Sequence, residues 1–191
     1  VTLKHGRLLL SFSDGLVKLV STSSGETISS VKHDHSLSNV SYIGETNDII
    51  GVDYVSGDIV VYDAALEKIR RRIKIDSPVQ RLIGQLREQS YFYIDLDGAL
   101  RIISPDMEYE LYHGEEKIRY VLPIHDKRIA LTVSDTVIKA VDLRLGSEFL
   151  RWKASEEIEE IFPFGDGVWV CTSTSIEYIS LVGIKSKGNL K

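Results

Sequence analysis

The chain alternates between short apolar runs and clusters of Gly, Asp and Ser, and this pattern recurs at a nearly constant interval. The clearest copies span residues 13–20, 56–63 and 96–103, and weaker copies span 134–142 and 173–179. Five anchor positions mark their turns: Gly15, Gly57, Gly98, Thr136 and Thr174. The intervals between successive anchors are 42, 41, 38 and 38 residues. A period of about 40 residues with turns between apolar strands is typical of β-propeller blades.

A second series of residues keeps the same phase. Four positions each follow an apolar pair and precede a polar turn: Gly44, Gly84, Pro123 and Pro163. The intervals between them are 40, 39 and 40 residues. Gly and Pro mark places where a β-ladder stops or bends, so we expect a strand to end at each of them. The anchor positions and these Gly and Pro positions keep the same spacing over four units, which indicates a structural repeat.

Each unit contains four strand-like runs, which are clearest in the second unit. We predict an inner strand at residues 39–43, followed by strands at 49–54, 59–62 and 68–75. Several of these runs are apolar on successive residues. Because neighbouring side chains of a strand point to opposite faces, a continuous apolar run indicates burial on both faces. Stacked blades provide that environment.

The pattern predicts an all-β fold, a β-propeller of four-stranded antiparallel blades in one domain. We place the approximate blades at 1–36, 37–76, 77–115, 116–155 and 156–191. The last blade is incomplete, because its final nine residues are too polar and glycine-broken for an outer strand. Two interpretations stay open: a five-bladed ring with an imperfect seam, or part of a larger propeller. The second is favoured because the chain begins within the pattern and ends one strand short.

One copy of the repeat carries a family resemblance. Residues 56–63, Ser-Gly-Asp-Ile-Val-Val-Tyr-Asp, resemble the third strand of a WD-repeat blade, and Val141-Asp142 resembles a degenerate version. The segments 21–28 and 142–146 are similar to the turn that follows that strand in the family. No copy has the glycine-histidine pair or the tryptophan-aspartate ending, so the side-chain network of those residues is not carried over. The quinoprotein propeller is a rival, although only Trp152 lies near the tryptophan position of that family.

Composition narrows the class of protein. A chain of 191 residues with 43% hydrophobic and 27% charged residues is typical of a globular domain. The net charge of −5 argues against a general nucleic-acid binder. No apolar stretch approaches the roughly 20 residues of a membrane span, and no signal-peptide pattern is visible. Cys171 is the only cysteine, so we expect a reducing, intracellular location, in the cytoplasm or nucleus.

One outer strand carries a row of cations. In an extended strand with a period of two, four basic side chains share a face: Lys68, Arg70, Arg72 and Lys74. We call this row the basic ridge. Charges of this kind protect an exposed strand from pairing with other molecules, and this is the interpretation that we favour. The alternative is a docking site for an acidic segment, a phosphate or an anionic lipid.

Acidic residues, in contrast, gather in the turns and links between strands. Propeller topology places the turn between the second and third strands on the same rim as the link from each outer strand to the next inner strand. The turns contribute Asp14, Asp58, Asp97 and Asp135. The links contribute Asp34, Asp76, Glu115, Glu116, Glu156 and Glu157. We therefore predict a negative rim that attracts a basic peptide or protein.

The sequence shows no catalytic constellation. The cluster His33-Asp34-His35 is the only one that suggests a metal, but no third ligand is assigned by spacing, and we predict an exposed loop. Cys171 is expected to be a buried structural thiol. There is no phosphate-binding glycine loop, nucleophile elbow or paired-cysteine site. We assign no catalytic, cofactor-binding or metal-binding residue.

These observations predict a non-catalytic platform for protein–protein interaction, or a scaffold subunit of a larger protein complex, with other subunits as partners. One alternative is an enzyme or cofactor-binding propeller of quinoprotein or hydrolase type, with its site in the central channel. Mostly aliphatic inner-strand positions argue against it: Val40, Ile43, Val79, Leu82, Ile118, Val121, Ile158 and Ile161. The other alternative is a propeller that binds anionic lipid through the basic ridge. Nucleic acid is not an expected partner.

Overall fold

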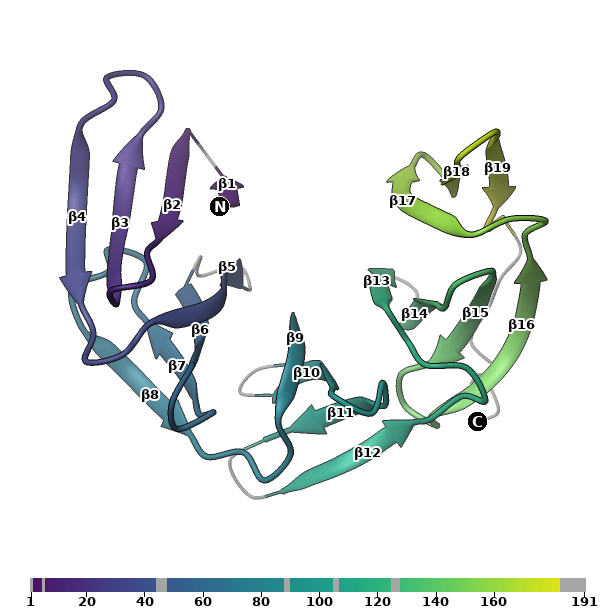
Figure 1. The fold of residues 1–191 in the computed structure, drawn as a ribbon, viewed down its shortest axis with the longest axis horizontal. Coiled ribbons are helices and arrows are strands. Elements are labelled where there is room, and N and C mark those ends of the chain that lie inside the picture. Colours follow the sequence, from purple (N-terminus) through teal and green to yellow (C-terminus); the bar gives the residue numbers. More distant parts are fainter. Residues whose placement is uncertain are drawn as a thin grey trace. The chain divides into compact units, whose positions relative to one another are not determined.

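The computed structural model of the protein describes residues 2–4, 6–43, 48–87, 90–104, 107–124 and 128–182. These residues form nineteen strands and no helix. The strands make five antiparallel sheets, four of which have four strands and one of which has three (Figure 1). The predicted all-β fold of repeated four-stranded sheets is confirmed.

In every sheet the strands follow one another in chain order. The first sheet contains β1 (Thr2–Lys4), β2 (Arg7–Ser11), β3 (Leu16–Ser21) and β4 (Thr27–Lys32). The second contains β5 (Leu37–Ile43), β6 (Asp48–Asp53), β7 (Ile59–Tyr62) and β8 (Ile69–Ile73). The third contains β9 (Val79–Arg87), β10 (Ser90–Asp95), β11 (Leu100–Ile103) and β12 (Glu108–Tyr112). The fourth contains β13 (Tyr120–Ile124), β14 (Ile129–Val133), β15 (Val137–Asp142) and β16 (Ser147–Lys153). The fifth contains β17 (Ile158–Phe164), β18 (Gly167–Thr172) and β19 (Ile176–Ser180).

The chain divides into two compact units. Unit 1 comprises Val1–Leu96 and Arg101–Tyr109, and therefore holds the first two sheets and most of the third. Unit 2 comprises Asp97–Leu100 and Glu110–Lys191, and holds the fourth and fifth sheets. The assignment of the chain to a single domain stays a prediction.

In unit 1 the second sheet is buried on both faces. Ile49, Val60 and Tyr62 pack with residues of the first sheet. On the other face, Ile50 and Val61 pack with residues of the third sheet. All four residues of β7 are buried for this reason. Burying a large aliphatic side chain contributes about 1.5–3 kcal/mol, so stacking on both faces explains why these strands are apolar on successive residues.

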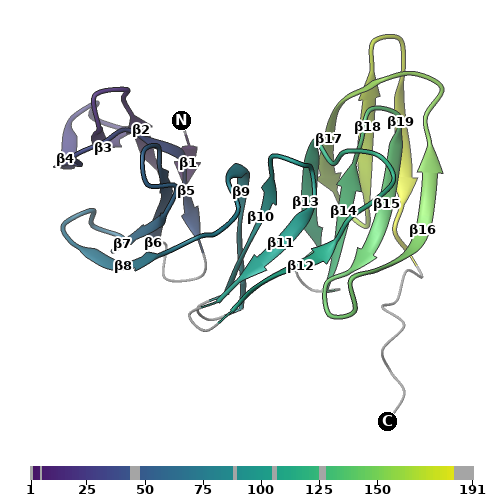
Figure 2. The same cartoon turned by 60° about the horizontal axis from the view of Figure 1, so that its bottom comes forward.

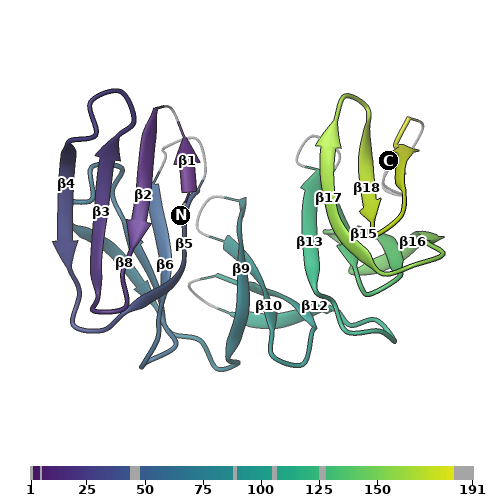
Figure 3. The ribbon, with the colours of Figure 1, turned by 45° about the horizontal axis from the view of Figure 1, so that its top comes forward.

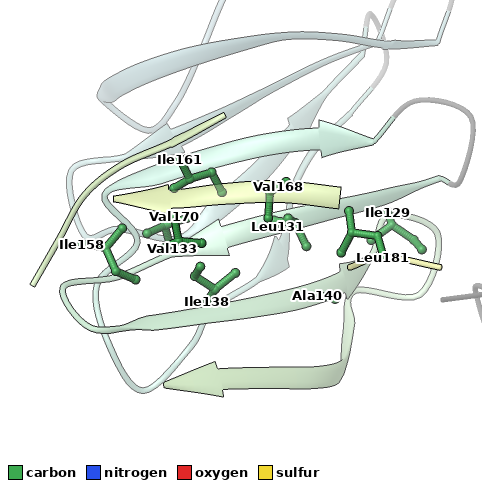
Figure 4. Packing of buried hydrophobic residues seen from close by; sticks show 10 residues of the cluster. All are labelled: Ile129, Leu131, Val133, Ile138, Ala140, Ile158, Ile161, Val168, Val170 and Leu181. Carbon is green, nitrogen blue, oxygen red and sulfur yellow. The ribbon is translucent and has the colours of Figure 1, made fainter. Parts of the chain in front are cut away.

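In unit 2 the fourth and fifth sheets are stacked face to face (Figure 2). Leu131 and Ile138 of the fourth sheet pack against Val168 and Val170 of the fifth (Figure 4). Side chains alternate between the two faces of a strand. Trp169 and Cys171, which alternate with Val168 and Val170 in β18, therefore point to the other face of the fifth sheet.

The second sequence series does not end strands as expected. Gly84 lies inside β9, Pro123 inside β13 and Pro163 inside β17. These three strands are the first strands of their sheets and have no neighbour on one side. At such an edge, a missing backbone N–H or side chain is tolerated. Gly44 and the tail 183–191 lie outside the described residues.

Candidate interaction surfaces

The turns and links of unit 1 share one rim, as predicted. The carbonyl oxygen of Gly15, in the β2–β3 turn, accepts a 2.9 Å hydrogen bond from the backbone N–H of His33, in the β4–β5 link. The backbone N–H of Tyr54, in the β6–β7 turn, donates to the carbonyl of Ser36 in the same link at 3.0 Å. Figure 3 shows the β2–β3 turn and the β4–β5 link at the same end of the first sheet. Backbone bonds thus hold the turns in fixed positions along this rim.

Large apolar side chains of unit 1 stand exposed just after β2, β6 and β10 end. We call this set the turn crest: Phe12, Tyr54, Val55 and Leu96. Their exposed fractions lie between 42 and 76%. Exposed apolar side chains that recur at successive turns, beside polar residues, make these turns candidates for an interaction site. The repeat pattern alone did not reveal the crest, although each member lies two or three residues before an anchor glycine.

A hollow of about 410 Å³ lies beside Phe12 in unit 1. Its polar wall comes from the β2–β3 turn, the β4–β5 link and the start of β5, and is made by Ser11, Ser13, Ser36, Ser38 and Asn39. Asn39 has a positive φ of 53°, and the pairing of β5 with β6 shifts between Ser38 and Ser41. The inner strand therefore bulges at this hollow, which has room for a side chain.

Carboxylates flank the crest. Asp14 forms a 2.8 Å ion pair with Lys32, and this hydrogen bond lowers the pKa of Asp14. Asp34 and Asp76 are exposed and Asp58 is half-buried. Within the described residues, these three carboxylates form no ion pair. Three of the predicted rim acids of unit 1 are therefore available to a basic ligand.

The β4–β5 link is joined to the second sheet by a buried network. Asp53 accepts hydrogen bonds from the backbone N–H groups of Val55 at 2.9 Å and Ser56 at 3.1 Å. The Nδ1 atom of His35 lies 3.2 Å from the same carboxylate. Burial disfavours the Asp53 anion, but these hydrogen bonds outweigh burial and lower its pKa. The network fixes the turn that carries Tyr54 and Val55.

His33 is buried, so the predicted exposed loop at His33-Asp34-His35 is wrong for its first residue. Arg72 Nη2 donates to His33 Nε2 at 2.8 Å. Because a guanidinium can only donate, Nε2 is the acceptor and the Nδ1 proton faces the carbonyl oxygen of His35, 3.2 Å away. His33 is therefore a structural residue of the link.

We expect the β6–β7 turn to lose stability in acid. The pKa of Asp53 in the folded protein is below its ordinary value of 3.8, so its contribution is complete above that value and is lost as the pH falls through the folded pKa. Hydrogen exchange at the Val55 and Ser56 amides should show falling protection against local opening below about pH 4. Asp53→Asn removes this titration, and equal pH dependence in both proteins would contradict the assignment.

The basic ridge is only partly free. Arg70 and Arg72 are exposed, whereas Ile73 is buried, as the period of two predicts. Arg70 forms a 3.1 Å ion pair with Asp48, and Arg72 contacts His33 and lies 3.6 Å from Asp53. In the described part of the chain, Lys68 and Lys74 form no ion pair and lie at the two ends of the ridge. Ile69 lies between Lys68 and Arg70 in the sequence and is also exposed, since the pairing of β7 with β8 shifts beside Tyr62.

The predicted rim acids of unit 2 are compensated by nearby groups. Glu157 pairs with Arg119, and Glu115 lies 4.0 Å from Arg151. Glu156 accepts hydrogen bonds from Ser173 and Thr174 (3.0 and 2.8 Å). These compensating side chains lie far from the acids along the chain, so they could not be recognised from sequence spacing.

Glu116, whose side chain is 34% exposed, belongs to a charge cluster around the buried Lys139. Its carboxylate lies 2.5 Å from the Nζ atom of Lys139 and 2.5 Å from Arg151. The side chain of Lys139 is only 3% exposed, and Glu148 lies 3.7 Å from it. The hydrogen bond from Lys139 lowers the pKa of Glu116. Burial disfavours the Lys139 cation, but the Glu116 hydrogen bond and the neighbouring Tyr112 outweigh it and raise the pKa of Lys139.

No metal site is seen in the described residues, where no three His, Cys, Asp or Glu side chains are placed to hold an ion. Five of the aliphatic residues predicted for inner strands are buried, although Ile118 lies before β13 rather than in it: Leu82, Ile118, Val121, Ile158 and Ile161. Cys171, which was expected to be buried, is half-buried. The same part of the chain has no helix that is long and apolar enough to cross a membrane.

Comparison with known proteins gives a clear result for the fold. The structure is similar to the β-propeller domain of Cps50 (Swd1) from Myceliophteria thermophila, with a TM-score of 0.70 at 11% identity over 86% of this chain. It is also similar to the C-terminal WD40 domain of Sif2, with a TM-score of 0.66 at 13% identity over 92% of this chain. The fold is that of a WD40 β-propeller. The resemblance to WD repeats, read from sequence, is confirmed at the level of this fold.

A third similar structure is the computationally designed protein Ika8, with a TM-score of 0.66 at 17% identity over 94% of this chain. The present chain covers only 57% of Ika8, 58% of the Cps50 domain and 52% of the Sif2 domain. It therefore spans little more than half the length of each of these three structures. No family model and no curated protein matches its sequence.

Proposed function

We propose that this chain is a non-catalytic protein-interaction platform with the WD40 propeller fold, and that the rim of unit 1 binds a basic segment of a partner protein. The observation that carries the proposal is the turn crest, whose apolar tips are held by the backbone and flanked by free carboxylates. Apolar anchors supply most of the energy of an interface, while the carboxylates select positive charge and speed the encounter.

The expected ligand combines lysine or arginine with at least one large apolar residue. Its cations would face Asp34 and Asp76, which are exposed. An apolar side chain would contact Tyr54 or Val55, and a second side chain fits the serine-lined hollow beside Phe12. We also propose an intracellular location, because the single cysteine offers no internal disulfide. The lipid-binding alternative draws less support, since Arg70 and Arg72 are paired within the protein.

Selection of short random peptides displayed on phage against the immobilised chain tests this function. We expect the enriched peptides to be basic and to carry a large apolar residue, and their affinity to fall as ionic strength rises. The double variant Tyr54→Ser, Val55→Ser should weaken binding at least about tenfold. Ile28→Ser is the matched control, because Ile28 is exposed in β4 away from the turns.

Two outcomes would overturn the proposal. In the first, the enriched peptides are acidic or neutral, and the affinity is independent of salt. In the second, the crest variant and Ile28→Ser bind equally well. Circular dichroism of both variants checks that the fold is retained, which is expected because the substituted side chains are exposed.

A further inference from the structure

The fifth sheet has one apolar face that no part of the described chain covers. Ile161, Val168 and Val170 point toward the fourth sheet and pack there. The opposite face carries large side chains from all three strands. We call it the aromatic face: Phe162, Phe164, Trp169, Cys171, Ile176 and Tyr178.

Strand register shows which position this face holds in the repeat. In the fourth sheet one row of paired residues crosses β13, β14 and β15, and it consists of Leu122, Leu131 and Ala140. In the fifth sheet the corresponding row crosses β17, β18 and β19, and it consists of Phe162, Trp169 and Tyr178. The row of the fourth sheet is the one covered by the fifth sheet (Figure 4). The aromatic face is therefore the face that a following sheet would cover.

Exposure follows the same equivalence. Ile138 pairs with Val133 in the fourth sheet and is 2% exposed, whereas Ile176 pairs with Cys171 in the fifth sheet and is 69% exposed. The second sheet repeats the arrangement, because its paired residues Ile50 and Val61 are buried by residues of the third sheet. The second and fourth sheets thus bury this face against the next sheet, whereas the same face of the fifth sheet is exposed.

The aromatic side chains are already ordered on the sheet. The ring of Trp169 lies 6.4 Å from that of Phe164 and 5.1 Å from that of Tyr178, with tilted planes in both pairs. Such tilted pairs are stabilised by more than simple burial. Gly167 lets the Tyr178 ring lie close to the sheet, since a Cβ atom there would come within 2.5 Å of that ring. The face is a preformed packing surface.

We propose that the aromatic face packs against a further propeller blade, a β-sheet outside residues 1–191 that presents small side chains to it. Stacked sheets lie about 10 Å apart. Rings now fill positions where the fourth sheet has Leu131 and Ala140, so the opposing sheet has room only for residues such as Gly, Ala, Ser or Val. The solved propeller domains of Cps50 and Sif2 provide the second argument, since this chain covers only 58% and 52% of their lengths.

A second copy of this chain fits less well than a further blade. Head-to-tail stacking would set the aromatic face against the outer face of the first sheet, opposite its buried Leu9 and Leu19. Alternation along the strands places Leu8, Leu10 and Leu16 on that outer face. Leucines facing aromatic rings would overfill the space between the sheets. Two copies would also bring ten sheets together, whereas propellers typically have about four to eight blades.

Photo-crosslinking in cells that produce the native protein tests the proposal. A benzoylphenylalanine residue replaces Tyr178 in one variant and Leu145 in a control, because Leu145 is exposed in the β15–β16 turn and off the aromatic face. We expect the first variant to crosslink at least tenfold more strongly, to one segment outside residues 1–191. That segment should alternate in β-strand fashion and carry small residues at the positions facing the crosslinker.

Ile176→Ser supplies a second measurement. Because Ile176 is largely exposed within residues 1–191, we expect this change to leave the Leu145-site crosslink unaltered and to reduce the Tyr178-site crosslink about tenfold. The proposal is overturned if the Tyr178 and Leu145 sites crosslink equally, or if the crosslinked segment is helical. It is also overturned if mixed isotope labelling shows that the partner is a second copy of residues 1–191.

Discussion

Glu116→Ala is expected to lower the free energy of unfolding by about 2 kcal/mol, less than the roughly 3–5 kcal/mol lost when one partner of a fully buried ion pair is removed, because only Lys139 of this pair is buried. The substitution leaves the Lys139 ammonium buried, with Glu148 as its nearest remaining carboxylate at 3.7 Å. Glu116→Gln keeps a hydrogen-bond acceptor without the charge and should cost less. Urea denaturation measures the effect, provided that the slope with denaturant is unchanged.

The matched control is Asp135→Ala. Asp135 forms a 3.0 Å ion pair with Arg119, but both side chains are exposed, and such a pair contributes about 0–1 kcal/mol. Equal losses for the two alanine variants would contradict the account of the cluster around Lys139. The pKa of Glu116 is lowered in the fold, so its stabilisation is complete above its ordinary value and is lost as the pH falls through the folded pKa. The difference between Glu116→Ala and the native chain should therefore shrink in acid.

Gly15→Ala is expected to cost about 2–5 kcal/mol. Gly15 has a φ of +87°, where a side chain adds roughly 1–2 kcal/mol. A Cβ atom there would also lie 2.5 Å from the carbonyl oxygen of His33 and 2.8 Å from that of His35. Both are backbone atoms, so the β4–β5 link must move to make room, at a further cost of about 1–3 kcal/mol. Thermal and urea unfolding measure the loss.

Gly57→Ala separates the two causes. Gly57 occupies the same position in the next repeat and has a φ of +77°, but an added Cβ atom would meet nothing within 4 Å. We expect a cost of only about 1–2 kcal/mol, from the backbone conformation alone. If Gly57→Ala proves as harmful as Gly15→Ala, then the contact with the link is unimportant and the rim is held in another way.

The sequence predicted the five sheets because two local rules repeat in it. Strands need apolar residues on both faces when sheets stack, and turns such as that at Gly15 need a residue that accepts positive φ. The rim shared by turns and links followed from topology. The ends of edge strands were not predicted correctly. Pro123 and Pro163 lie inside strands that lack one neighbour, where proline does not have to end the strand.

The candidate surfaces were harder to predict because charge compensation is not local. Glu116 is neutralised by Lys139 and Arg151, which are 23 and 35 residues away. Arg72 of the basic ridge contacts His33 across 39 residues. A count of acidic and basic residues along the sequence cannot show which charges meet. The turn crest could be recognised only from the solvent exposure of its side chains. In the sequence, the apolar residues beside Gly15 and Gly57 cannot be distinguished from core residues.

The bonds that fix the rim of unit 1 have an evolutionary consequence. The groups that join Gly15 to His33 and Tyr54 to Ser36 belong to the main chain, and they are present whatever the side chain at the tip. Mutation can therefore exchange Phe12, Tyr54, Val55 or Leu96 while the tips keep their positions. Recognition can diverge, or be redesigned, at these four sites with little change in the stability of the fold.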